Sequence, residues 1–311
     1  MKKSIIIAGI SGQDGSILAE KLSNNYKIIG LTRKKISNKK LVKIDKKILL
    51  IKTDYTYKSL FKIIKKYKPI EIYNFACQSN PSLSWVKINE TSFSIVNITI
   101  NFLEIIRKHF KKIKYFNASS CEIFKRKTTK HSEYDEIFPN NPYGISKSFA
   151  HFLTIAYRKK FNLFLVNGIL FNHESLRRNK IYLGKKLITE AHELFKKKRS
   201  KIVLNDTSAI RDFSYAYDII NGIIEVMRLN KSDDFIIASG KSRSVRDFAK
   251  VIFNELNIPL NKLKSLNNKG KDFRGANISK ILHKTKWKPK LNFKSFIKQM
   301  IRDYKKINSS N

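Results

Sequence analysis

Short apolar runs rich in β-branched residues alternate along the chain with stretches whose apolar positions have helical spacing. The runs predict strands at 4–9, 26–32, 47–53, 70–76, 113–119, 163–171 and 234–239. The helical spacing predicts helices at 15–24, 56–66, 91–109, 144–160, 184–199, 214–229, 244–255 and 293–306. Alternation of this kind builds βαβ crossovers, so we expect an α/β fold with a doubly wound parallel sheet covered by helices on both faces.

Two regions lack such patterns. The stretch 256–280 is polar and contains Pro259, Gly270 and Gly275, so we expect irregular structure there. The residues after Tyr304 are expected to fray.

The first predicted strand ends in a G-x-x-G-x-x-G turn made by Gly9, Gly12 and Gly15, with Gln13 and Asp14 inside it. Glycine lets the backbone turn sharply and come close to a pyrophosphate, and a helix N-terminus offers free N–H groups to that anion. The turn therefore predicts a dinucleotide site in a Rossmann-like domain. Three glycines can also serve as a turn alone, but the second predicted strand at 26–32 completes the βαβ unit that such a site needs.

The end of the second strand indicates which dinucleotide is bound. An Asp or Glu at this point binds the ribose of NAD, whereas an Arg suits the 2′-phosphate of NADP. Here Thr32 is followed by Arg33, and no acidic residue occurs between Glu20 and Asp45. The sequence therefore favours NADP, with Arg33 holding the phosphate.

The chain is strongly basic, with 64 Lys and Arg against 24 Asp and Glu among 311 residues, a formal charge of +40. Such a charge is typical of proteins that bind nucleic acid or anionic membranes. The excess is spread over the whole length and is mostly Lys, which favours a solvated surface over a nucleic-acid interface.

Cys77 and Cys121 have no metal-ligand spacing, and no apolar run is long enough to span a membrane, so we expect a cytoplasmic protein with reduced thiols and no metal.

A set of residues with the chemistry of an oxidoreductase follows the predicted strand at 113–119. Ser120 and Glu122 come directly after it, and Tyr143 and Lys147 open the next helix, four residues apart and so on one face. A tyrosine beside a fixed ammonium can act as a base if about three pKa units, or ~4 kcal/mol, are supplied electrostatically. Tyr182 and Lys186 repeat the Y-x-x-x-K spacing, so this spacing alone is weak evidence for a catalytic pair. The prediction depends on the order of the whole set along the chain: the glycine turn first, then Ser120 at a strand end, then Tyr143 and Lys147.

In these residues the chain resembles the extended short-chain dehydrogenase/reductase superfamily and, within it, the GDP-mannose 4,6-dehydratase family. The similarity covers roughly residues 4–255. It includes the stretch 74–79, the Arg211-Asp212-Phe213 and Ser244–Phe248 motifs, and above all 167–178, N-G-I-L-F-N-H-E-S-L-R-R, which is close to the family signature N-G-I-L-F-N-H-E-S-P-R-R.

The resemblance implies dehydration of GDP-D-mannose to GDP-4-keto-6-deoxy-D-mannose. Tyr143, aided by Ser120 and Lys147, would take the proton of the sugar 4-hydroxyl as hydride passes to NADP⁺. Glu122 would then remove the C5 proton and help eliminate water from C6, after which the hydride returns to C6. A simple 4-epimerase needs no second base, so Glu122 favours elimination.

The resemblance also implies further site residues and a division into lobes. It assigns Asp54 and Ala76 to the cofactor, and Asn172, Lys186, Arg211 and Arg274 to the GDP-sugar. It implies an NADP-binding domain at 1–166 plus about 211–240, and a smaller C-terminal substrate-binding lobe at 167–210 and 241–311. A homodimer or homotetramer is also implied, with the basic loop 33–40 near a neighbour's cofactor. Arg177 and Arg178 could be structural or lie at a subunit contact.

Departures from the family pattern leave alternatives open. Ser120 replaces a threonine, Cys121 a serine, Leu176 a proline and Lys185 an arginine, and the segment after Arg274 is short. The alternatives are a 4,6-dehydratase of another GDP-sugar such as a GDP-heptose, a nucleotide-sugar epimerase or reductase, and, outside this class, a basic nucleic-acid-binding protein.

Overall fold

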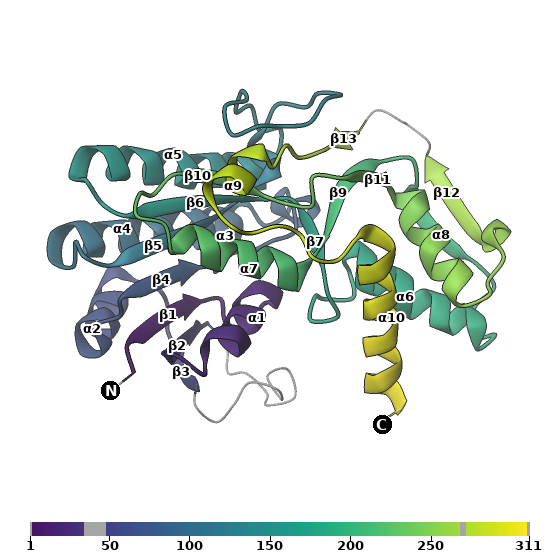
Figure 1. The fold of residues 1–311 in the computed structure, drawn as a ribbon, viewed down its shortest axis with the longest axis horizontal. Helices are drawn as coiled ribbons and strands as arrows, with labels where there is room; N and C mark the ends of the chain where they lie inside the picture. Colours follow the sequence, from purple (N-terminus) through teal and green to yellow (C-terminus); the bar gives the residue numbers. More distant parts are fainter. Residues whose placement is uncertain (1, 34–47, 268–271, 310–311) are drawn as a thin grey trace.

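Seven parallel strands form the central sheet of the computed structural model, which describes residues 2–33, 48–267 and 272–309. Their order is β10-β6-β5-β4-β1-β2-β3 (Figure 1). The strands are β1 Ser4–Ala8, β2 Lys27–Thr32, β3 Ile48–Lys52, β4 Glu71–Asn74, β5 Lys114–Ser120, β6 Leu165–Leu170 and β10 Asp234–Ile237. This confirms the predicted doubly wound α/β fold, and all seven strands lie where apolar runs predict them.

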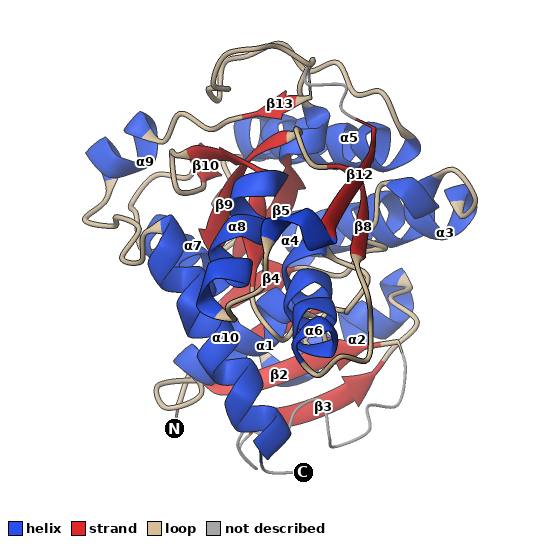
Figure 2. Ribbon diagram, turned by 90° about the vertical axis from the view of Figure 1, so that its right-hand side faces the viewer, coloured by secondary structure: helices blue, strands red, loops and turns tan. Residues whose placement is uncertain are grey.

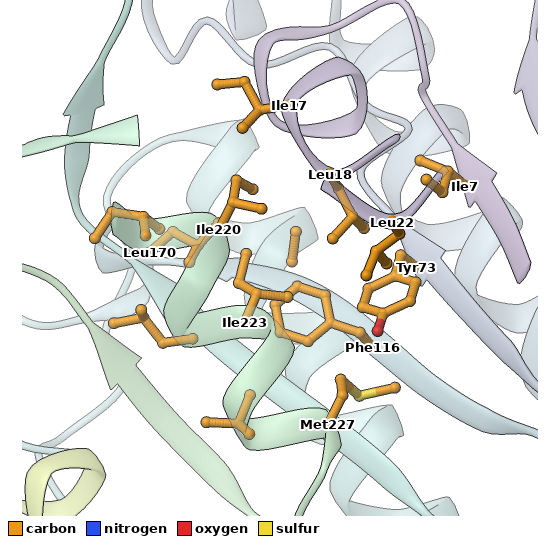
Figure 3. Packing of buried hydrophobic residues seen from close by; sticks show 14 of the residues in the cluster. Ile7, Ile17, Leu18, Leu22, Tyr73, Phe116, Leu170, Ile220, Ile223 and Met227 are labelled. Atoms are coloured by element: carbon orange, nitrogen blue, oxygen red, sulfur yellow. The ribbon is translucent and has the colours of Figure 1, made fainter. Parts of the chain in front are cut away.

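Helices cover both faces of this sheet. On one face α1 (Gln13–Leu22) and α7 (Ala216–Met227) pack against the strands through one apolar cluster, part of which Figure 3 shows: Ile7, Ile17, Leu18, Leu22, Tyr73, Phe116, Leu170, Ile220, Ile223 and Met227. On the other face α2 (Tyr57–Tyr67), α4 (Ile98–His109) and α5 (Pro142–Phe161) share a second cluster. Both faces of the inner strands are thereby dry, which explains why these strands are continuous apolar runs, whereas Leu49 and Leu50 of the edge strand β3 are exposed.

A smaller C-terminal lobe stands beside the sheet (Figures 1 and 2). It contains a four-stranded sheet and a parallel strand pair, packed on three helices around a separate apolar cluster. The sheet has β7 Asn172–Glu174, β9 Ile210–Tyr215, β11 Ser242–Ser244 and β13 Phe273–Arg274; the pair is β8 Ile202–Asp206 and β12 Leu263–Asn267; the helices are α6 Leu183–Phe195, α8 Val245–Glu255 and α10 Phe293–Ser309. The division at residues 166, 211 and 240 stays a prediction.

Several local predictions were wrong, and for the stretch 256–280 long-range strand pairing is the reason. The helix predicted at 91–109 is α3 (Ile88–Ser92), a π-helical turn (Phe93–Asn97) and then α4. The stretch 256–280 contains β12, β13 and the start of α9 (Ser279–Lys284), because polar strands there pair with β8 and β9. The last helix continues past Tyr304 to Ser309, and β9 extends to Tyr215, into the start of the helix predicted at 214–229.

No helix within the described residues is long and apolar enough to cross a membrane.

Candidate active site

The glycine turn after β1 forms one wall of the site. Gly9 has a φ of +78°, and a Cβ there would lie 2.8 Å from the carbonyl carbon of Phe75. A Cβ at Gly15 would lie 2.6 Å from the carbonyl oxygen of Gly9, so both positions require glycine. Gly12 is the N-cap of α1 and, being glycine, offers no side-chain acceptor to the first turn. Those first N–H groups suit an external anion, so the turn fits the phosphates of a dinucleotide.

A cleft of about 1170 Å³ runs from this turn past the carboxyl ends of β4, β5 and β6. It exceeds the roughly 300–1,000 Å³ of a single small-ligand site. Most of the predicted site residues line it: Gly9, Gly12, Gln13, Asp14, Gly15, Arg33, Ala76, Ser120, Glu122, Tyr143, Lys147 and Asn172.

Four predicted residues that the structure describes lie outside the walls of this cleft: Asp54, Lys186, Arg211 and Arg274. The exposed carboxylate of Asp54 accepts hydrogen bonds from the N–H and hydroxyl of Thr56, at 3.0 Å each. Its neighbour Tyr55 lines the cleft instead, and the phenol oxygen accepts a bond from the Gly9 N–H at 3.3 Å. No local pattern points to Tyr55, because its contact with Gly9 spans 46 residues.

Arg33 stands at the edge of the cleft, where its guanidinium pairs with Glu90 of α3 at 3.5 Å. The rest of the predicted basic loop, residues 34–40, lies outside the described residues.

The end of β5 and the start of α5 bring the four proposed catalytic side chains into the same cleft. Asn141 caps α5 by accepting the Gly144 N–H at 2.8 Å, and its amide donates to the Glu122 carboxylate at 3.1 Å. Gly144 packs against the Glu122 backbone, since a Cβ there would lie 2.5 Å from its carbonyl oxygen. One capping residue therefore fixes both the helix that carries Tyr143 and the position of Glu122.

Tyr143 and Lys147 share a face of α5, as their spacing predicts. The Lys147 ammonium donates to the Ala118 carbonyl at 2.7 Å and lies 5.7 Å from the centre of the Tyr143 ring. Burial raises the pKa of the Tyr143 phenol well above its usual value, while a hydrogen bond with Ser120 acts to lower it. Tyr143 therefore needs a further positive charge beside it before it can act as a base near neutral pH.

Glu122 also belongs to a chain of ion pairs outside the cleft. Its carboxylate pairs with Arg274, whose Nε lies 3.5 Å from Asp272. Asp272 pairs in turn with Arg211, the neighbour of Arg274 in the β9–β13 ladder. The structure thus brings Arg211 and Arg274 together next to the proposed base.

The segment 172–178 connects the cleft to the C-terminal lobe and contacts the first helix. The Ser175 hydroxyl donates to the Gln13 amide oxygen at 2.8 Å, and Arg177 pairs with Glu20 of α1. Arg178 pairs with Glu174 at 2.6 Å and lies over the ring of Tyr182. Within this chain, Arg177 and Arg178 therefore have structural partners.

Among the described residues, no group of three or more His, Cys, Asp or Glu side chains is placed to hold a metal ion.

Comparison with known proteins finds the same fold among solved structures and identifies a family among sequence relatives. Among solved structures, dTDP-glucose 4,6-dehydratase from Bacillus anthracis in complex with NAD superposes with a TM-score of 0.87 at 21% identity, covering 98% of this chain and 97% of that one. UDP-glucuronic acid 4-epimerase from Bacillus cereus superposes with a TM-score of 0.86 at 20% identity, covering 98% of this chain and 99% of that one. At these identities the likeness establishes the fold alone.

Relatives found by sequence identify the family more specifically than the solved structures do. GDP-mannose 4,6 dehydratase 2 of Arabidopsis thaliana is 30% identical, covering 96% of this chain and 86% of its own. GDP-mannose 4,6-dehydratase of Vibrio cholerae is 30% identical, and the match covers 84% of this chain and 74% of that protein. The family model described as GDP-mannose 4,6 dehydratase matches residues 6–300. With the glycine turn and the Ser120, Glu122, Tyr143 and Lys147 set in one cleft, this match shows that the chain belongs to the GDP-mannose 4,6-dehydratase family.

Proposed function

We propose that this protein converts GDP-D-mannose to GDP-4-keto-6-deoxy-D-mannose with NADP as its cofactor. The observation that carries the proposal is the placement of an acid–base set and a second carboxylate in the same cleft as a dinucleotide-type glycine turn. The family match over residues 6–300 supports the substrate. Arg33 at the cleft edge supports NADP over NAD, because a guanidinium suits a 2′-phosphate.

NADP, when bound, supplies the reversible oxidation of the sugar at C4. Tyr143 takes the proton of the 4-hydroxyl, and Ser120 holds that oxygen by its own hydroxyl. Lys147 is fixed by the Ala118 carbonyl so that its charge stays beside the Tyr143 ring. The positive nicotinamide ring would add the further charge that buried Tyr143 needs.

Glu122 removes the C5 proton, which the 4-ketone makes acidic, and delivers a proton to the C6 hydroxyl as it leaves as water. Asn141 holds this carboxylate in place at 3.1 Å. The hydride taken from C4 would then be returned to C6 and a proton would be added at C5. The product has therefore lost one water and carries a ketone at C4, with no net consumption of cofactor.

We assign Asn172 of the cleft wall to the sugar nucleotide, with Lys186, Arg211 and Arg274 holding its diphosphate and nucleoside. Arg274 would have to exchange Glu122 for the diphosphate, a step that would also free the base. Asp54 and Ala76 are assigned to the cofactor. We further propose a homodimer or homotetramer acting in the cytoplasm, where the free thiols Cys77 and Cys121 stay reduced.

Another GDP-sugar is the second candidate substrate. Leu176 lines the cleft where the family signature has proline, so the wall of the sugar site has changed.

The test is to incubate the purified protein with NADP⁺ and GDP-mannose and to follow the sugar nucleotide by mass spectrometry. Loss of one water without net NADPH supports the dehydratase. Isomerisation without loss of water, which leaves the mass unchanged and is therefore followed by chromatography, would support an epimerase. Net consumption of NADPH supplied in a parallel reaction would support a reductase. No reaction with cofactor bound would refute GDP-mannose as substrate, and a GDP-heptose would be tried next.

A further inference from the structure

A histidine and an aspartate from distant parts of the chain meet in the wall of the cleft. His173 lies on β7 and Asp14 in the first turn of α1, and both line the cleft. The His173 Nε2 lies 2.9 Å from the Asp14 carboxylate, and its Nδ1 lies 2.7 Å from the Phe171 carbonyl oxygen. The histidine is only 8% exposed.

Both ring nitrogens of His173 therefore face groups that can only accept hydrogen bonds. A neutral imidazole has one N–H and could satisfy one of them, leaving the other nitrogen's lone pair against an oxygen. An imidazolium donates to both. The geometry thus fits a positively charged ring paired with a carboxylate.

The surrounding charges agree with this assignment. Burial acts to lower the pKa of His173, but the charge and hydrogen bond of Asp14 outweigh it and raise that pKa above its usual value. Arg178 is the opposing positive charge, and it is itself paired with Glu174. The pKa of Asp14 is lowered, because His173, Gln13 and Arg178 together overcome the effect of burial.

We propose that His173 is a positioning residue that, as an imidazolium, fastens the first turn of α1 to β7, so that the glycine turn is held in the arrangement that binds the dinucleotide. Two neighbouring hydrogen bonds also hold the first turn of α1 against β7 and the residues that follow it. The Gln13 amide donates to the His173 carbonyl at 3.2 Å, and Ser175 donates to Gln13. The inference rests on the proposed function only in taking this turn as the cofactor site.

A consequence is that cofactor affinity depends on the charge of a residue that belongs to the C-terminal lobe. The contacts of both ring nitrogens call for the imidazolium. Because the His173 pKa is raised, this form persists to higher pH than in an ordinary histidine and is lost as the pH rises through the raised pKa. Affinity for NADP⁺ should therefore fall as the pH increases above neutrality, where the phosphates of the cofactor are already ionised.

The first test needs no cofactor. The six histidines are labelled with ¹⁵N, and the His173 ring signals are identified by their loss in His173→Gln. Two protonated ring nitrogens at about pH 7 are expected, although the reference pKa of ~6.5 would leave most rings neutral. A neutral ring would overturn the proposal.

The second test measures the dissociation constant of NADP⁺ from about pH 7 to about pH 9. For His173→Gln we expect about tenfold weaker binding near neutrality, within the usual range of coupling between sites, and a flat pH profile. The matched control is His192→Gln, since His192 lies on α6, bonds to Ile188 of its own helix and is not part of the cleft wall. Equal affinity and an equal pH profile in His173→Gln and the wild type would overturn the proposal.

Asp14→Asn provides a second route if His173→Gln fails to fold. It keeps the size of the side chain and removes the charge, so it should weaken NADP⁺ binding similarly, and the double variant should lose little more than either single one. Strictly additive losses would contradict a working pair. If the wild type itself binds no NADP⁺, the proposed function fails, while the ¹⁵N measurement still decides the state of His173.

Discussion

Replacing Glu122 by glutamine tests the elimination step most directly. The amide keeps the size of the side chain and can still accept the hydrogen bond from Asn141. The variant loses the negative charge that pairs with Arg274, but Arg274 keeps Asp272 as a partner at 3.5 Å. The fold and the glycine turn should therefore survive, and the change is confined to the ability to accept a proton.

The expected loss can be sized from the role of the carboxylate. A positioned general base contributes roughly 10²–10⁴-fold to a rate, which corresponds to about 3–5 kcal/mol of barrier. Because Tyr143, Ser120 and Lys147 are untouched, oxidation at C4 should continue. Glu122→Gln should therefore bind NADP⁺ like the wild type, form some reduced cofactor with the 4-keto sugar, and lose water slowly.

The assay follows water loss by mass spectrometry and reduced nicotinamide by absorbance in the same reaction. Glu136→Gln is the matched control, because this exposed carboxylate pairs with Lys125 at 2.8 Å within the same loop region and should be dispensable. Dehydration by Glu122→Gln at the rate of the control would refute the assignment of Glu122 as the base.

Three further outcomes are expected. Tyr143→Phe should lower the turnover number by roughly 10²–10⁴-fold while leaving the NADP⁺ dissociation constant unchanged, and a wild-type turnover number would remove Tyr143 from the mechanism. Gly15→Ala should abolish cofactor binding and lower the melting temperature, because its Cβ would meet the Gly9 carbonyl at 2.6 Å; calorimetry and a binding titration check both. Arg33→Ala should weaken the binding of NADP⁺ but not that of NAD⁺, by about 1.5–3 kcal/mol, which is typical of a hydrogen bond to a charged group. Equal losses of affinity for both dinucleotides would show that Arg33 does not bind the 2′-phosphate.

Local signals were sufficient to predict the central sheet and its first turn. The inner strands of that sheet are buried on both faces, so their apolar runs are visible in the sequence. Gly15 is imposed by its contact with Gly9 within the turn, and Gly9 by its positive φ, although Gly9 also lies against the backbone of the distant Phe75. The Y-x-x-x-K spacing of Tyr143 and Lys147 is also local, since it depends on a single helix.

The parts that sequence reasoning missed depend on contacts between distant segments. Strand β13 has only two residues and exists because it pairs with β9, more than 60 residues earlier. The His173–Asp14 pair joins positions 159 residues apart, and Tyr55 reaches the glycine turn across 46. No spacing rule within one element could predict these contacts.

The order of the sheet has a consequence for how the chain can be synthesised and cut. Helix α7 and strand β10 complete one face and one edge of the dinucleotide-binding sheet, yet they follow β7, β8 and β9 of the C-terminal lobe in the sequence. A fragment ending at residue 166 would leave Phe116 and the inner side of α1 exposed to water, without Ile219, Ile220 or Ile223 to cover them. The ribosome must therefore deliver most of both lobes before either half of the site has its core, and proteolysis between the lobes should release no independently folded cofactor-binding half.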